Sequence, residues 1–341
     1  MAVKILAITS CMFWLLATVA PVQAQTAPLF SIPVECEIGK TCFIFKYLDT
    51  DPGEGFHDFN CSLRSSDGHK GTDIALVDPA DIDKPYKVLA AAEGVVVGIR
   101  DVLPDNPPGV ADFPAGQNCG NGVRIDHGNG WTTQYCHMKH GSVKVKTGMS
   151  VRRGRVLGFV GSSGQSERPH LHFQVERNGV PVDPYTAKPN TAKSTCASGK
   201  VDLAARSLWT EIASTKVKLY RPFVIEYIGL STIVPDMETT LKRLVPPTGK
   251  ADDPLIVVYS SVLGARTGTT LTMDIVDPNG AVFFTHTESY DKGRARLFRY
   301  AGSKRSDGPF QTGTWTAKVT VSGDGPSGPY TETRSAPFII N

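Results

Sequence analysis

The chain has 341 residues, of which 40% are hydrophobic and 20% charged, so it is long and apolar enough for two cores and is neither disordered nor fibrous. Its formal net charge of +3 is spread over interspersed acidic and basic residues, which excludes the clustered basic patch that nucleic-acid binding requires. Its 33 glycines and 24 prolines show no period, which predicts many short strands joined by turns rather than long helices.

The first 24 residues have the pattern of an export signal. Lys4 precedes an apolar stretch from Ile5 to Ala20, and Val22-Gln23-Ala24 offers small residues for a cleavage site. The apolar run of about 16 residues is shorter than a membrane-spanning helix needs, and Cys11 lies inside the run, which disfavours a lipid anchor. We therefore predict that residues 1–24 are removed and that the mature chain is exported to the periplasm or cell envelope, or secreted, without a stable membrane span.

The cysteines that remain after this signal are even in number, which in an exported chain predicts three disulfides. Cys119 and Cys136 flank an expected hairpin, so antiparallel pairing of its strands would bring them within bridging distance. The other four cysteines allow three connectivities, among which the sequence does not choose. No C-x-x-C pair is present, which disfavours a zinc site built from thiolates. The six cysteines are Cys36, Cys42, Cys61, Cys119, Cys136 and Cys196.

Residues 25–60 form a segment with one expected strand, at 43–48. From 61 to 186, short runs rich in valine and isoleucine alternate with glycine turns, a pattern typical of an all-β domain. Residues 103–118 are polar, rich in proline and glycine and without periodicity, so we expect a long surface loop there. The strands of this domain are predicted at 73–77, 88–92, 94–99, 123–126, 132–137, 156–160 and 171–177.

Residues 187–203 have the composition of a linker. The stretch 204–341 contains a second series of strands over about 130 residues, which fits an immunoglobulin-like β-sandwich. It carries one histidine, His286, and no recognisable catalytic set, so we expect a binding or positioning module with an envelope protein as its candidate partner. Its strands are predicted at 216–220, 254–262, 270–276, 282–288, 295–300, 314–321 and 335–340.

Seven of the eight histidines lie between residues 57 and 172, and two groups of them have spacings suited to metal binding. His69 and Asp73 stand four residues apart across a glycine, and imidazole nitrogen and carboxylate oxygen are both good zinc donors, although a surface turn explains this motif better when it is considered alone. His170 and His172 alternate with apolar residues, so a strand would present both imidazoles on one face. His137, at the end of an expected strand, would be structural if considered alone.

Together these motifs resemble the lysostaphin-type, LytM-like zinc metalloendopeptidases. The resemblance covers about residues 68–184. The sequence departs from the family's commonest form at 163–169, where T-G-x-S-T-G-P is usual and Glu167 and Arg168 replace small residues. This departure concerns the substrate groove rather than the metal site. The matching motifs, in the family's order, are H-x-G-x-D at 69–73, the hairpin at 120–127, Y-x-H at 135–137, the glycine-bearing run at 143–158, H-L-H-F at 170–173 and V-D-P at 182–184.

The resemblance implies an all-β peptidase domain of antiparallel sheets, of the duplicated hybrid motif type. It implies that His69, Asp73 and His172 bind one zinc ion and that His137 and His170 line the site without binding the metal. Three protein ligands leave the fourth position open for water, as a catalytic zinc requires. One histidine of the pair would take a proton from the attacking water and the other would assist the oxyanion or the leaving amine. The sequence does not assign these two roles.

The family's substrates are peptide bridges of peptidoglycan, so the resemblance implies an exported zinc metalloendopeptidase acting on peptidoglycan stem peptides. One alternative is a metal-free relative that activates other cell-wall hydrolases, and another is a wall-binding module. Regulatory relatives usually lose ligands, whereas this sequence keeps all five site residues. His57, His127 and His140 match no family role, and we expect them at the surface or in turns.

Overall fold

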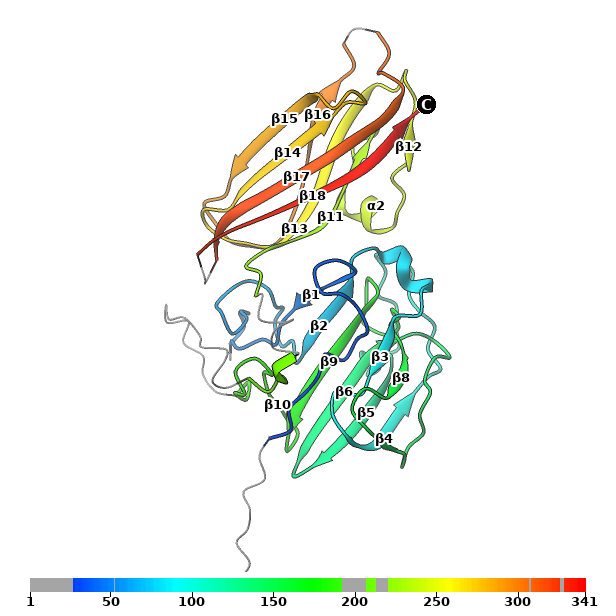
Figure 1. Cartoon of the computed structure of the whole chain (residues 1–341), viewed down its shortest axis with the longest axis vertical. Coiled ribbons are helices and arrows are strands. Elements are labelled where there is room, and N and C mark those ends of the chain that lie inside the picture. The colour runs from blue at the N-terminus through cyan, green and yellow to red at the C-terminus, as the bar shows by residue number, and fades with distance from the viewer. Residues whose placement is uncertain (1–26, 52, 192–206, 213–219, 307, 326–327) are drawn as a thin grey trace, which may run out of the picture.

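The regular structure of the chain, described here by a computed structural model, is almost entirely β-strand (Figure 1). The predicted export signal, most of the predicted linker and Cys196 lie outside the described residues. Within the part of the chain that the structure describes, no helix is both long and apolar enough to cross a membrane. The described residues are 27–51, 53–191, 207–212, 220–306, 308–325 and 328–341.

The first half of the chain is built on an eight-stranded antiparallel sheet. Seven of its strands have the order β1-β2-β9-β6-β5-β4-β7, and the eighth, β10, pairs with β9. A separate two-stranded sheet pairs β3 with β8, and a short 3-10 helix, η1, follows β2. The bounds are β1 Cys42–Lys46, β2 Thr72–Leu76, η1 Pro79–Asp83, β3 Lys87–Leu89, β4 Gly94–Arg100, β5 Asn121–Gly128, β6 Trp131–Met138, β7 Ser150–Val151, β8 Val156–Phe159, β9 His170–Arg177 and β10 Val180–Pro181.

One face of this sheet is apolar because the strands alternate. Leu171, Phe173 and Val175 of β9 are fully buried in the domain core, together with Val123 and Ile125 of β5. The intervening residues of β9 therefore point to the opposite face of the sheet, which is the face that carries the histidines.

The predicted strands agree with β2, β4, β5, β6, β8 and β9 to within two residues at either end. The strand predicted at 88–92 is shorter, since β3 ends at Leu89 and the Ala91 amide donates to the Tyr135 hydroxyl instead of to a strand. The two-residue strands β7 and β10 were not predicted. β1, predicted within the segment 25–60, pairs with β2 and so forms the edge of the main sheet.

The second half of the chain is a sandwich of two sheets, with orders β11-β13-β16 and β12-β18-β17-β14-β15, around a second hydrophobic core. The all-β fold class and the immunoglobulin-like sandwich are as predicted from the sequence. The strand β11, the two-residue β12 and the short helix α2 were not predicted, and most of the strand predicted at 216–220 lies outside the described residues. The bounds are β11 Val224–Ser231, α2 Met237–Leu241, β12 Thr248–Gly249, β13 Leu255–Ala265, β14 Thr270–Val276, β15 Val282–Ser289, β16 Arg294–Lys304, β17 Gly313–Gly325 and β18 Gly328–Ile340.

The two halves meet where β1 and β2 approach the sandwich (Figure 1). A small hydrophobic cluster spans this contact and combines side chains from both halves, which include Phe43 and Phe45 of β1 and Leu263 of β13. Arg64, which is 2% exposed, adds a polar link by donating to the carbonyl of Arg221 at 3.1 Å. The sandwich is therefore packed against the edge of the main sheet.

Two disulfides connect described cysteines. Cys119 is bonded to Cys136, as the predicted hairpin requires, and Cys36 is bonded to Cys42. Cys61 is also disulfide-bonded. The predicted pairing of Cys119 with Cys136 is confirmed, and the bridge joins the loop before β5 to the end of β6.

Candidate metal centre

Three donor side chains meet where β2 lies beside β9. Asp73 of β2 and His172 of β9 are direct cross-strand partners, and His69 lies just before β2. Asp73 Oδ1 lies 2.8 Å from His172 Nδ1 and 3.0 Å from His69 Nε2, and these two nitrogens are 3.1 Å apart. The three predicted ligands thus form a compact group that could hold a metal ion.

Each of the two imidazoles is oriented by a partner on its other nitrogen. His69 Nδ1 lies 2.7 Å from the carbonyl oxygen of Tyr47, and His172 Nε2 lies 3.4 Å from Oε1 of Gln174. Because a carbonyl only accepts, His69 must carry a proton on Nδ1, which leaves Nε2 as the nitrogen that faces Asp73 and can bind a metal. This is the arrangement in which an outer partner fixes a metal-binding histidine.

Gly71 allows the chain between His69 and Asp73 to pass close to β9. A Cβ atom at this position would lie 2.6 Å from the carbonyl oxygen of Phe173 and 2.8 Å from Cε1 of His172. A side chain cannot fit there without displacing one of these groups. The glycine in the H-x-G-x-D motif is thus required by packing against a candidate ligand.

His137 and His170 stand beside the three donors. Their ring centroids are 4.5 Å apart, and the ring of His137 lies 5.9 Å from that of His172. His170 Nε2 is 3.7 Å from Asp73 Oδ2, so this nitrogen faces the donor group. All five residues predicted from the sequence are therefore brought to one place.

A backbone irregularity turns His137 toward the site. The register of β6 against β5 shifts between Tyr135 and Met138, and His137 has a φ of 62°, a left-handed conformation that is uncommon for a residue with a side chain. Cys136 and His137 both line the cavity although they are consecutive in the chain. Regular alternation would place only one of them there.

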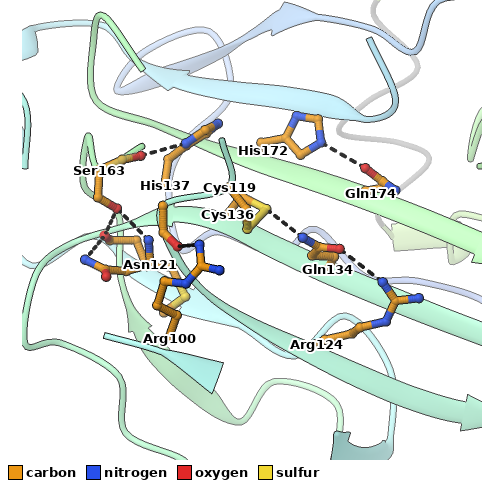
Figure 2. The surroundings of a disulfide bond; sticks show 12 residues. Arg100, Cys119, Asn121, Arg124, Gln134, Cys136, His137, Ser163, His172 and Gln174 are labelled. Carbon is orange, nitrogen blue, oxygen red and sulfur yellow. Dashed lines mark hydrogen bonds between the residues drawn. A yellow bond between two sulfur atoms is a disulfide. The ribbon is translucent and has the colours of Figure 1, made fainter. Parts of the chain in front are cut away.

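The neighbouring disulfide holds this irregular backbone, as Figure 2 shows. The amide of His137 donates to the carbonyl of Cys119 at 2.8 Å, and the carbonyl of His137 accepts from the amide of Gly161 at 3.0 Å. The side chain is fixed as well, since His137 Nδ1 lies 2.8 Å from the carbonyl of Ser163. His170 is held in the same way, with Nδ1 2.9 Å from the carbonyl of Arg168.

The site has unusual electrostatics because it is buried. Burial, followed by the charges of His170 and His172, lowers the pKa of His137 well below its ordinary value. Burial also lowers the pKa of His170, to about 4. For Asp73, burial opposes ionisation, but His69 and His170 outweigh it and hold the pKa of the carboxyl well below its usual range. At neutral pH the aspartate is therefore ionised, and His137 and His170 are neutral.

A cavity of about 870 Å³ opens over these residues. Its walls come from both halves of the chain. The first half contributes all five predicted site residues, and the sandwich contributes Leu241 of α2, Leu263 of β13 and Ala295 and Arg296 of β16. The sandwich thus forms part of the wall beside the candidate metal centre.

The other histidines of the predicted cluster lie outside the cavity wall. His140 is exposed, as expected, and its Nδ1 lies 3.0 Å from the carbonyl of Leu103. His127 is half-buried within β5, with Nε2 2.8 Å from Thr133 Oγ1, so the expectation of a surface or turn position was wrong for this residue. His57 is half-buried beside Asp51.

Several groups that orient the site were not identified from the sequence. The carbonyls of Tyr47, Ser163 and Arg168 belong to the backbone and leave no signal in residue type. Gln174 could have been identified from the sequence, because it continues the alternation of His170 and His172 along β9 and so shares their face.

Comparison with known proteins supports the resemblance. Residues 67–184 match the model of Peptidase family M23. The chain is similar to DD-carboxypeptidase/endopeptidase Mpg of Neisseria meningitidis serogroup B, with 44% identity over 78 residues, which are 23% of this chain and 17% of Mpg. It is also similar to peptidoglycan DD-endopeptidase ShyA of Vibrio cholerae serotype O1, with 35% identity over 126 residues, which are 37% of this chain and 24% of ShyA. The matched stretches are thus small parts of these relatives.

Among solved structures, the chain resembles a zinc containing peptidase from Vibrio cholerae, with a TM-score of 0.32 and 25% identity. The likeness covers 46% of this chain and 39% of that chain. The family resemblance predicted from the sequence motifs is confirmed by the family match.

Proposed function

Starting from the match of residues 67–184 to the model of Peptidase family M23, we propose that this protein is an exported zinc metalloendopeptidase that hydrolyses peptide cross-links of peptidoglycan. The observation that carries the proposal is the convergence of His69, Asp73 and His172 beside the buried pair His137 and His170. A site with three ligands and two free histidines has the parts that a hydrolytic metal centre needs.

The donor set suits zinc. Two imidazole nitrogens and one carboxylate oxygen are ligands that zinc commonly takes, and three protein ligands leave a position open. His69 Nε2 and His172 Nδ1 both face Asp73 Oδ1, at 3.0 and 2.8 Å, so a cation held by the carboxylate can also take a lone pair from each ring. When bound, zinc supplies Lewis-acid polarisation of the scissile carbonyl and lowers the pKa of water.

His137 and His170 are suited to proton transfer. Both carry the proton on Nδ1, because each Nδ1 faces a backbone carbonyl, so Nε2 is the free acceptor in each ring. Since burial depresses the pKa of both rings, each is neutral at neutral pH, with no proton on Nε2. Either can accept a proton from the attacking water at Nε2 and return it to the leaving amine.

Two features support action outside the cytoplasm on peptidoglycan. Disulfides such as Cys119–Cys136 form in oxidising compartments, in agreement with the predicted export signal at 1–24. ShyA, which resembles this chain over the peptidase region, is a peptidoglycan DD-endopeptidase. The proposed substrates are therefore the stem peptides of peptidoglycan.

The test is hydrolysis of purified sacculi by the zinc-loaded mature chain, followed by mass spectrometry of the released muropeptides. We expect wild type to release muropeptides with cleaved cross-links and His170→Ala to release very few. The matched control is His140→Ala, since His140 is an exposed histidine outside the cavity wall and its loss should leave hydrolysis intact.

Absence of any release by the zinc-loaded wild type contradicts the enzymatic proposal. A non-catalytic regulator of other wall hydrolases, or a wall-binding module, then becomes the better description. Binding of the protein to intact sacculi, measured by sedimentation, together with stimulation of a second hydrolase separates these two.

A further inference from the structure

We propose that Glu226 of the sandwich is a positioning residue for the candidate active site and that it acts through Arg168 on His170. The inference rests on the proposed peptidase function. It adds that the sandwich is a working part of the catalytic unit rather than an independent binding module.

Arg168 stands where the commonest form of the family has a small residue, and its side chain is 3% exposed. Its Nη1 donates to Glu226 Oε1 at 2.5 Å, and its Nη2 donates to the carbonyl of Leu76 at 2.7 Å. The guanidinium carbon lies 5.1 and 5.4 Å from the ring centroids of Phe43 and Phe45. The side chain is thus fixed jointly by β1, β2 and the sandwich.

Glu226 lies on β11 and is fully buried. Oε2 accepts from Ser261 Oγ at 2.8 Å, and Oε1 also accepts from Nη2 of Arg296 at 3.0 Å. Burial opposes ionisation of Glu226, but Arg168 and Arg296 hold the pKa of its carboxyl below the ordinary value. The carboxylate is therefore charged and accepts hydrogen bonds from two guanidinium groups, those of Arg168 and Arg296.

A buried ion pair is poor evidence for added stability, because removing two charges from water offsets much of their attraction. An apolar pair would join two domains equally well. What an ion pair adds is direction, since a guanidinium and a carboxylate bind in a defined relative geometry. This favours a role in setting the position of Arg168 over a role in adhesion alone.

The backbone of Arg168 touches His170 directly. The carbonyl of Arg168 lies 2.9 Å from His170 Nδ1, and Ser166 Oγ lies 3.1 Å from the same nitrogen while donating to that carbonyl at 2.7 Å. The ring of Phe45, which faces the Arg168 guanidinium, also lies 6.1 Å from the ring of His170. A residue whose side chain is anchored by the sandwich thus fixes the tautomer and orientation of His170.

The decisive variant is Glu226→Gln, which keeps the size of the side chain and removes its charge. We expect kcat on a cross-linked muropeptide to fall about 10-fold or more, with KM and zinc content close to wild type. Nitrogen-15 NMR of the histidine rings should show His170 as the Nδ1-protonated tautomer in wild type and as a mixture in the variant. A purely structural role would lower stability without moving either readout in the folded protein.

The matched control is Glu288→Gln, because Glu288 also pairs with an arginine of the sandwich, Arg299, at 3.0 Å, whereas its partners Arg299 and Tyr290 lie outside the cavity wall that Arg168 lines. It should leave kcat and the His170 tautomer unchanged. If Glu226→Gln does not fold, the double variant Glu226→Leu with Arg168→Met fills the interface with apolar groups. The same loss of kcat and of the single tautomer is expected in that double variant.

Wild-type kcat with an unaltered His170 tautomer in a folded Glu226 variant overturns the proposal, as does an equal loss in Glu288→Gln. Failure of the underlying function gives a different result. In that case the zinc-loaded wild type itself hydrolyses nothing, and the tautomer comparison between wild type and Glu226→Gln still tests the positioning.

Discussion

Asp73 and His172 face each other across β2 and β9, with Asp73 Oδ1 2.8 Å from His172 Nδ1. Because both residues belong to paired strands in the middle of a sheet, the separation of these donors is set by strand register rather than by loop conformation. The candidate metal centre is therefore built into the rigid part of the domain.

Replacing Asp73 by asparagine should abolish zinc binding while the sheet remains folded. The change removes the charged ligand and leaves a neutral amide, which is a poor zinc donor. Metal analysis after dialysis should find about one zinc per wild-type chain and nearly none in the variant. Asp83→Asn, at an exposed carboxylate in η1, is the control and should retain the metal. Stoichiometric zinc in Asp73→Asn would falsify the proposed ligand set.

Gly71→Ala should weaken zinc binding although Gly71 carries no donor atom. The added Cβ would lie 2.6 Å from the carbonyl oxygen of Phe173 and 2.8 Å from Cε1 of His172, so β9 or the His172 ring must shift and the geometry of the donors changes. We expect a loss of about 10-fold to 100-fold in zinc affinity, measured by competition with a chelating dye. Gly98→Ala is the control, because its Cβ would lie 3.9 Å from the nearest side-chain atom. Equal affinities in both variants would show that the close approach is not needed.

Removing the disulfide near the site with Cys119→Ala and Cys136→Ala should lower both stability and hydrolysis. The bridge spans 17 residues, for which the loss of loop constraint corresponds to about 3 kcal/mol of unfolding free energy. The strained backbone of His137 also loses its support from Cys119. Urea unfolding and muropeptide release measure the two effects.

The double variant Cys36→Ala with Cys42→Ala provides the comparison for that experiment. Its bridge spans 6 residues, so the stability loss should be smaller. Neither cysteine lines the cavity, so hydrolysis by the folded protein should be unaffected. Similar losses of hydrolysis in the two double variants would contradict a specific role for the Cys119–Cys136 bridge.

Asp183 should make the protein less stable as the pH rises. Burial raises the pKa of its carboxyl from 3.8 to about 6, against the opposing hydrogen bonds from Tyr185 and Thr186. Between about pH 4 and pH 6 the folded protein therefore binds more protons than the unfolded chain, and the free energy of unfolding falls with rising pH. Asp183→Asn should remove this slope and add about 3 kcal/mol at neutral pH.

The measurement is urea unfolding at several pH values from 4 to 8. Asp112→Asn, at an exposed position in the long loop, is the control and should keep the wild-type slope. A slope that is unchanged in Asp183→Asn would show that another group causes the pH dependence.

The sequence was informative wherever function depends on residue type at fixed spacing. His170 and His172 were expected on one face of a strand, and they lie on β9 with Leu171 and Phe173 in the core behind them. The pairing of Cys119 with Cys136 also followed from a local hairpin. These features are short-range, so the alternation of a strand and the closure of a turn suffice to predict them.

The sequence was uninformative where a contact joins distant segments. β11 was not predicted, and near its start lies Glu226, a charged residue whose burial is compensated by ion pairs with Arg168 and Arg296. The carbonyl of Tyr47 that orients His69 is equally invisible, since every residue has a carbonyl.

The sequence by itself predicted the all-β class, the family resemblance and the five candidate site residues, because strand periodicity and motif spacing are local properties. Only the tertiary structure decided that the sandwich forms part of the cavity wall and that Arg168, a departure from the family pattern, forms an ion pair with Glu226. That partnership joins two residues 58 positions apart, one in the loop before β9 and one on β11, and burial of opposite charges against each other has no signature along the chain.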